Sequence, residues 1–270
     1  MERTDSDLFA ARLSDMLRVS ERGEVALSPF LTPEEGAEAE RFLRLCGATE
    51  RLRLWGGYPA AERRRAYLLP EYLTASSDWM PPTDTDPAET LSDDRLIGAV
   101  SAVRIEGSGY RELSHRDHLG SLLALGLERD ALGDIAVQDA HTAVVFCTAR
   151  VAEFLCTSLE RVANDRVRCV PYRPDENFSD CRRTVPVTDT VASARLDCAV
   201  AALVNCSRET ARAAIAGGQI SVDHVLAERP DRTLVPPCLI SVRGVGRFHL
   251  LPFEGETRRG RLRLRAEKFV

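Results

Sequence analysis

The sequence predicts an α+β protein of three small domains, over residues 1–80, 91–172 and 190–270. Two observations support this fold class. Helical and alternating apolar patterns succeed one another along the chain, and two polar segments, 81–90 and 173–190, interrupt them and are predicted to be linkers. A chain of 270 residues also exceeds one typical domain, so we expect each part to form a small core of its own.

The first domain is predicted to be a small α/β unit. Thr32 and Glu35 have the spacing of a capping box, with Pro33 at the first helical position. Apolar spacing predicts, in chain order, a helix over 5–22, a helix over 33–46, a strand over 51–55, a Gly56-Gly57 turn with a short helix, and a strand over 66–69. The arginines of segment 62–65 either approach a phosphate or form a solvated basic helix end, and we favour the structural interpretation.

The second domain is predicted to be a ferredoxin-like sandwich, the architecture that also builds RNA-recognition-motif (RRM) domains. Its elements follow the order βαββαβ: a strand over 96–106, a helix capped by Ser114 and ended by Gly126, strands over 134–137 and 142–147, a helix over 150–162 and a strand over 167–170. RRM domains stack bases on aromatic side chains of the third strand. Phe146 is the only benzenoid aromatic residue of that strand, so the sequence predicts the fold without RRM-type base stacking.

The third domain begins with two short helices. Leu196, Val200 and Leu203 have helical spacing, and Ser207 is placed to cap a second helix, which Gly217-Gly218 ends. This pattern predicts a compact helical pair ahead of the alternating segments that follow.

Basic residues recur on the second helix and in the tail of this domain. Arg208 and Arg212 lie one turn apart, where both guanidinium groups could reach one phosphate backbone. Two predicted strands, 219–222 and 239–242, come next. Segment 261–266 alternates arginine with apolar residues, which fits an edge strand with a charged face or a ladder of phosphate contacts, and both interpretations stay open.

Charge is distributed unevenly along the chain. The formal net charge is −5, yet residues 191–270 carry 13 Lys+Arg and 8 Asp+Glu, so that the acidic excess lies entirely in the preceding part. Such asymmetry indicates a nucleic-acid contact at the basic end. Lys268 is the only lysine of the chain, and this skew reflects base composition, so arginine content alone is no evidence of RNA binding.

The order of motifs in the third domain resembles the S-four domain, an RNA-binding module named after a small-subunit ribosomal protein. The matching residues are Arg195-Leu196-Asp197, Ser207-Arg208, Gly217-Gly218 and Arg243-Gly244. Further motifs extend the resemblance to the bacterial YlmH-type S-four proteins over nearly the whole chain, at 56–63, 113–120, 125–129, 133–135, 243–248 and 255–261. His224 and Cys238 depart from the turn residues common in S-four domains, which concerns turn chemistry and not the arginine face.

The resemblance implies a non-enzymatic protein of the ribosome. YlmH-like proteins bind the large ribosomal subunit carrying peptidyl-tRNA, where they assist the rescue of stalled nascent chains by alanine tailing without mRNA. The partners expected on this basis are rRNA and tRNA, for a monomer that uses no cofactor and no metal. The candidate RNA-binding residues are Arg195, Ser207, Arg208, Arg212, Arg243, Arg247, Arg258, Arg259 and Arg261 in the third domain, with His115 and Arg116 in the second.

Two alternatives from other classes stay open: an RNA-modifying enzyme similar to a pseudouridine synthase, and a cell-division scaffold. Asp117, in His115-Arg116-Asp117, is the candidate catalytic residue of the first alternative. A pseudouridine synthase would carry Leu before this aspartate and Thr-Ser-Gly after it, and a kinase would need an asparagine where Leu122 stands. We therefore interpret Ser114 and Asp117 as a helix cap, with no catalytic residue.

The sequence argues against membrane insertion and secretion. Its apolar runs fall short of the roughly 20 residues that a membrane-spanning helix needs, and no signal peptide is visible at the N-terminus. The eight cysteines contain no C-x-x-C pair, which argues against a zinc site. We expect a cytoplasmic protein with reduced thiols.

Overall fold

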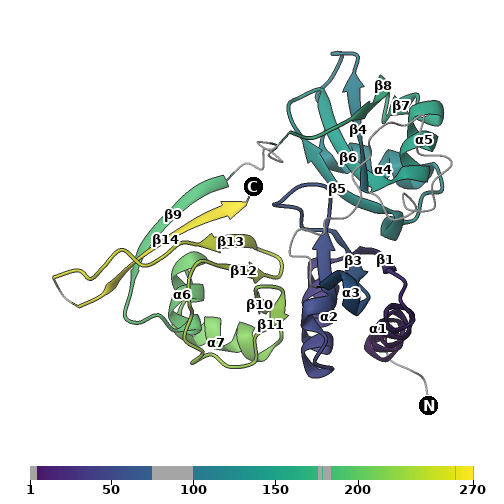
Figure 1. Cartoon of the computed structure of the whole chain (residues 1–270). Coiled ribbons are helices and arrows are strands. Elements are labelled where there is room, and N and C mark those ends of the chain that lie inside the picture. Colours follow the sequence, from purple (N-terminus) through teal and green to yellow (C-terminus); the bar gives the residue numbers. More distant parts are fainter. Residues whose placement is uncertain (1–4, 75–99, 176–177, 179–183, 259, 270) are drawn as a thin grey trace. The chain divides into compact units, whose positions relative to one another are not determined.

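The computed structural model describes residues 5–74, 100–175, 178, 184–258 and 260–269 (Figure 1). The chain divides into two compact units, 1–181 and 182–270. The first two predicted domains both fall in the first unit, where each has a sheet of its own, and the division into three domains stays a prediction. The predicted linker 81–90 and Arg259 lie outside the described residues.

The first unit opens with a three-stranded antiparallel sheet in the order β1-β3-β2. Its elements are α1 (Asp5–Glu21), β1 (Ala26–Leu31), α2 (Pro33–Leu45), β2 (Leu52–Trp55), β3 (Arg64–Leu68) and α3 (Glu71–Thr74). The capping box at α2 is confirmed, because Glu35 N donates to Thr32 Oγ1 at 3.2 Å and Thr32 N donates to the Glu35 carboxylate at 2.7 Å. Strand β1 was not predicted: Pro29 interrupts its pattern, and the pairing shifts register between Leu27 and Phe30 at this sheet edge.

The second sheet has the order β5-β6-β4-β8-β7, and all its pairs are antiparallel. The elements are β4 (Val100–Gly107), α4 (His115–Ala124), β5 (Leu132–Val137), β6 (Thr142–Thr148), α5 (Ala149–Ser158), β7 (Arg161–Val162) and β8 (Asp165–Tyr172). Without the short β7, this is the predicted βαββαβ ferredoxin-like topology. Helix α5 ends at Ser158, earlier than predicted, because Arg161 and Val162 pair with β8 instead.

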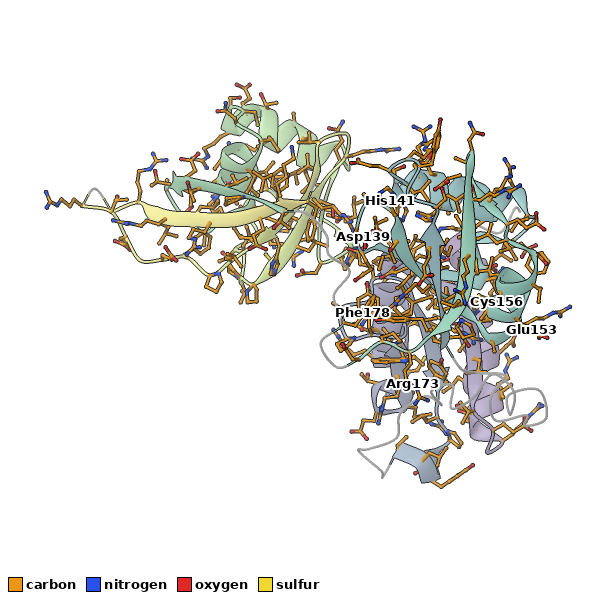
Figure 2. The ribbon with its side chains drawn as sticks, turned by 90° about the horizontal axis from the view of Figure 1, so that it is seen from above. Asp139, His141, Glu153, Cys156, Arg173 and Phe178 are labelled. Carbon is orange, nitrogen blue, oxygen red and sulfur yellow. The ribbon has the colours of Figure 1, made fainter. Side chains whose placement is uncertain are left out.

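Different residues pack on the two faces of this sheet. Leu122 of α4 and Leu155 of α5 are fully buried with Val103 and Val145 on one face. On the other face Tyr58 stacks on Phe146, with ring centroids 4.8 Å apart, and Phe178 meets Phe146 edge-on at 5.4 Å. Figure 2 shows Phe178 on the side of the sheet opposite α5, which carries Glu153 and Cys156. The face that RRM domains offer to bases is therefore occupied at its centre.

Asp134 holds Tyr58 and the segment that follows it against this face of the sheet. Its buried carboxylate accepts hydrogen bonds from Tyr58 Oη at 2.8 Å and from the backbone N–H groups of Glu62 and Arg63 at 2.8 and 3.0 Å. The Arg63 guanidinium donates to the carbonyl oxygens of Leu132, Phe30 and Arg129. The short helix predicted after Gly57 is wrong, because these long-range bonds hold segment 56–63 in turns.

The second unit contains one six-stranded antiparallel sheet, in the order β11-β10-β12-β13-β14-β9, beside two helices (Figure 1). Its elements are β9 (Thr184–Val191), α6 (Leu196–Leu203), α7 (Arg208–Ala216), β10 (Ile220–Val222), β11 (Val225–Leu226), β12 (Cys238–Val242), β13 (Gly246–Leu250) and β14 (Leu262–Phe269). Its core is continuous across helices and sheet, with Leu196, Ala211, Ile240 and Phe248 at its centre.

For this unit one prediction is wrong, and one of the two interpretations of the tail is excluded. Residues 184–190 are not a linker, since they form β9, which pairs with β14 along its whole length from Thr184–Phe269 to Val191–Leu262. The tail is consequently not an edge strand, because β14 lies between β13 and β9. The alternation itself is confirmed: Leu264 and Ala266 are buried, and the arginines between and before them are exposed.

Candidate nucleic-acid interface

A buried carboxylate organises the start of the second unit. Asp197 is fully buried in the first turn of α6, and three guanidinium groups converge on it. Arg195 donates from Nε to Oδ1 at 3.0 Å and from Nη2 to Oδ2 at 3.1 Å. Arg208 Nη2 and Arg212 Nε each reach Asp197 Oδ2 at 2.9 Å. We call Arg195, Arg208 and Arg212 with Asp197 the arginine cluster.

Local structure explains why these residues meet. Arg195 is the N-cap residue of α6, in extended conformation directly before the helix. The backbone of the first turn is held by loop 230–232, since Leu196 N donates to Arg232 O at 2.9 Å and Asp197 N to Pro230 O at 3.0 Å. Arg208 and Arg212 come from α7, which packs on α6 through Ala211.

The electrostatics of the cluster favour an anionic ligand. Burial acts to raise the pKa of Asp197, but the hydrogen bonds from Arg195, Arg208 and Arg212 outweigh it and hold the pKa below its ordinary value. The carboxylate is thus ionised at neutral pH, which leaves the cluster with a charge excess of two. The arginine side chains are 35%, 50% and 53% exposed, so the guanidinium edges that do not bond Asp197 face solvent. Such fixed, outward donors suit phosphate oxygens.

Ser207 acts as the predicted cap of α7. Its Oγ accepts a hydrogen bond from Thr210 N at 3.0 Å, and it lies 2.8 Å from Thr210 Oγ1. The side chain is exposed, so a contact of Ser207 with RNA stays a prediction.

The other predicted residues of this unit are dispersed over the sheet. Arg243 is exposed in the turn after β12, and Arg258 is exposed in the loop before β14. Arg247, on β13, is only partly exposed, and its guanidinium carbon lies 5.3 Å from the ring centre of Phe269. Arg261 donates to Thr190 Oγ1 at 3.0 Å and to the Thr190 carbonyl oxygen, which joins the tail to β9. Their role in RNA binding stays a prediction.

His115 and Arg116 lie in the first unit, exposed in the first turn of α4. The predicted cap beside them is confirmed. Asp117 Oδ2 accepts hydrogen bonds from Ser114 N at 2.9 Å and Ser114 Oγ at 2.6 Å, while Asp117 N donates to Ser114 Oγ at 3.2 Å. These bonds from Ser114 lower the pKa of Asp117. His118 is fully buried, and burial lowers its pKa to about 4.

Sequence reasoning missed the central role of Asp197. The available signal was a carboxylate inside the otherwise apolar helix 196–203, where an unpaired charge would be very costly. It also missed Arg229 and Arg232, which line a shallow groove next to the first turn of α6. Arg229 Nη2 pairs with Asp231 Oδ2 at 3.2 Å.

Among the described residues, no group of three or more His, Cys, Asp and Glu side chains has the arrangement of a metal site. The part of the chain that the structure describes also contains no helix with the length and apolar character to span a membrane.

Comparison with known proteins identifies the family. The family model "YlmH, N-terminal" matches residues 7–73, and the model "Putative RNA-binding domain in YlmH" matches residues 100–175. The curated "Ribosome-associated protein quality control protein P2" of Bacillus subtilis (strain 168) is 27% identical over 273 residues, which cover 98% of this chain and 96% of that protein. A solved structure of "Cell division protein ylmH from Streptococcus pneumoniae" aligns with a TM-score of 0.47 and 18% identity, over 66% of this chain and 98% of that one. With both family matches and a relative aligned end to end, the chain belongs to the YlmH family of RNA-binding proteins.

Proposed function

We propose that this protein is a non-enzymatic, ribosome-associated RNA-binding protein that acts in the quality control of stalled nascent chains. The observation that carries the proposal is the arginine cluster, in which a buried carboxylate holds three half-exposed guanidinium groups at one helix pair. The name of the Bacillus subtilis relative, a ribosome-associated quality control protein, supports the ribosome as the site of action.

The second unit acts as an S-four domain. Two short helices present the cluster, and the antiparallel sheet behind them fixes their spacing. Each guanidinium group donates to Asp197 on one side and exposes its remaining N–H groups to solvent. Donors held at fixed positions can bind phosphates at a defined spacing, which fits recognition of structured RNA by its shape. The ligands are rRNA and tRNA of the large ribosomal subunit, bound by a monomer in the cytoplasm.

Affinity purification of the tagged full-length chain from cells tests this function. We expect large ribosomal subunits with peptidyl-tRNA to co-purify, and their yield to fall for the Arg208→Ala/Arg212→Ala variant. Arg41→Ala/Arg44→Ala, on exposed positions of α2, is the control with the same loss of charge. Recovery of no ribosomal subunits, or equal recovery with both double variants, would contradict the proposal.

Asp117 has a structural role in this account and supplies no catalysis. Its carboxylate is engaged by Ser114 at the start of α4, and neither ring nitrogen of the neighbouring His118 has a hydrogen-bond partner among the described residues. A general acid or base needs a proton-transfer partner within reach of substrate. Purified protein incubated with total RNA is therefore expected to form no new pseudouridine or methylated base by mass spectrometry. Modification that disappears with Asp117→Asn would establish the enzyme alternative.

A further inference from the structure

The ferredoxin-like sheet of the first unit has a second basic surface, outside the arginine cluster. Phe146 on β6 and Ala102 on β4 lie beneath Tyr58 and Phe178 on the open sheet face. The remaining part of that face belongs to β4, β8 and β7, on the far side of β4 from β6.

Strand alternation places the arginines of these strands on the open face. Val162, Val167 and Cys169 pack into the core under the helices, so their neighbours Arg161, Arg166 and Arg168 point to the opposite face. All three arginines are exposed.

Arg104 on β4 shares this face. It is the register partner of Val170, two residues beyond Arg168, and its guanidinium carbon lies 4.2 Å above the ring of Tyr172. We call Arg104, Arg161, Arg166 and Arg168 the arginine-rich sheet face.

This surface is unfavourable for the isolated protein. Arg161 and Arg166 are register partners in the β7–β8 hairpin, and like charges directly opposite each other destabilise a strand pair. Glu106, the register partner of Arg168, is the one carboxylate that these three strands place on the face. Among the described residues, Arg161, Arg166 and Arg168 form no ion pair. The Arg161–Arg166 pair therefore opposes folding, whereas a polyanion would neutralise it.

We propose that the arginine-rich sheet face binds the phosphodiester backbone of RNA, as a second contact beside the arginine cluster. The contact is to phosphates and not to stacked bases, because the aromatic centre of the sheet is covered by Tyr58 and Phe178. Arg166 and Arg168 lie two positions apart on β8, and Arg161 and Arg104 lie on the strands beside it. Donors spread over neighbouring strands in this way suit a backbone contact without sequence preference. The ligand class rests on the proposed function, but the surface and its residues are independent of the arginine cluster.

Salt-dependent binding of the full-length protein to deproteinised ribosomal RNA tests the inference. Each lost phosphate contact lowers the slope of log K against log salt by about 0.7 to 0.9, which at 0.1 M salt is about a five- to eightfold loss of affinity. We expect this change for Arg166→Ala and about twice the change in slope for Arg166→Ala/Arg168→Ala. Arg150→Ala, which removes an exposed arginine from α5 on the helix side, is the matched control and should bind like the parent.

The melting temperature of Arg166→Ala and a parallel binding measurement on Arg208→Ala separate the possible outcomes. Arg166→Ala should leave the melting temperature unchanged or raise it, because it removes a like-charge pair. If Arg166→Ala/Arg168→Ala binds RNA like Arg150→Ala, the inference is wrong, whatever Arg208→Ala does. If Arg208→Ala has no effect while Arg166→Ala weakens binding, the sheet face stands and the proposed role of the arginine cluster fails.

Discussion

Replacing Asp197 by asparagine is expected to weaken RNA binding, although it makes the protein more positive by one charge. The carboxylate accepts four hydrogen bonds from Arg195, Arg208 and Arg212 and fixes the direction of each guanidinium. An amide offers one oxygen and no charge, so the arginines would repel one another and move apart into solvent. The lost pre-organisation then outweighs the gain in net charge.

The same substitution should destabilise the second unit by about 2–4 kcal/mol, as measured by urea unfolding. Removing one partner of a buried ion pair typically costs about 3–5 kcal/mol, and the half-exposed arginines, which can rehydrate, reduce this value. The pKa of Asp197 is depressed in the folded state, so its stabilisation is present above the unfolded-state value of 3.8 and is lost as the pH falls through the lower folded value. The parent should lose this contribution on acidification, and Asp197→Asn should not.

Asp15→Asn on α1 is the matched control, because it adds the same charge at an exposed carboxylate that pairs with Arg18. A surface pair of this kind contributes about 0–1 kcal/mol. We expect this control to bind RNA as tightly as the parent or slightly more tightly. Equal or tighter binding by Asp197→Asn would show that net charge, and not the geometry of the cluster, determines affinity.

Replacing Gly57 by alanine should disrupt the cover of the ferredoxin-like sheet. Gly57 has φ +100°, and an added Cβ would lie 2.3 Å from Phe146 Cδ1 and 3.0 Å from Val100 Cγ1. The backbone conformation costs about 1–2 kcal/mol for an L residue, and the steric conflict adds about 1–3 kcal/mol. Thermal unfolding of the first unit should therefore shift to markedly lower temperature.

Gly109→Ala separates the cost of the backbone conformation from the cost of the steric conflict. Gly109 has φ +87°, but nothing lies within 4 Å of an added Cβ, so only the backbone cost applies. We expect Gly109→Ala to lose less than half as much stability as Gly57→Ala. Equal losses would mean that segment 56–63 is not packed on Phe146.

Features fixed by neighbouring residues could be predicted from the sequence. The helix caps at Thr32, Ser114 and Ser207 were predicted because each depends on a hydrogen bond between residues three positions apart. The alternation of the tail likewise depends on local geometry and is confirmed, as is the order of elements in the ferredoxin-like sheet.

Features made by distant residues could not be predicted. Asp197 meets Arg208 and Arg212 across 11 and 15 positions, and Tyr58 meets Asp134 across 76, so neither contact leaves a periodic signal. Strand β9 was taken for a linker because its partner, β14, lies at the other end of the unit. That Phe146 stacks on no base stays a prediction, and the contacts of Tyr58 and Phe178 with Phe146 give it a tertiary reason that the sequence did not offer.

The salt dependence of RNA binding by Arg208→Ala tests the central claim most directly. In filter binding to deproteinised ribosomal RNA, we expect the slope of log K against log salt to fall by about one unit or less, because one phosphate contact is lost. Arg208→Lys should keep most of the slope, since the charge stays, and Arg41→Ala on α2 should keep all of it. Circular dichroism would verify that each variant is folded. If folded Arg208→Ala bound RNA as tightly as the parent at both low and moderate salt, the arginine cluster would not be an RNA-binding surface.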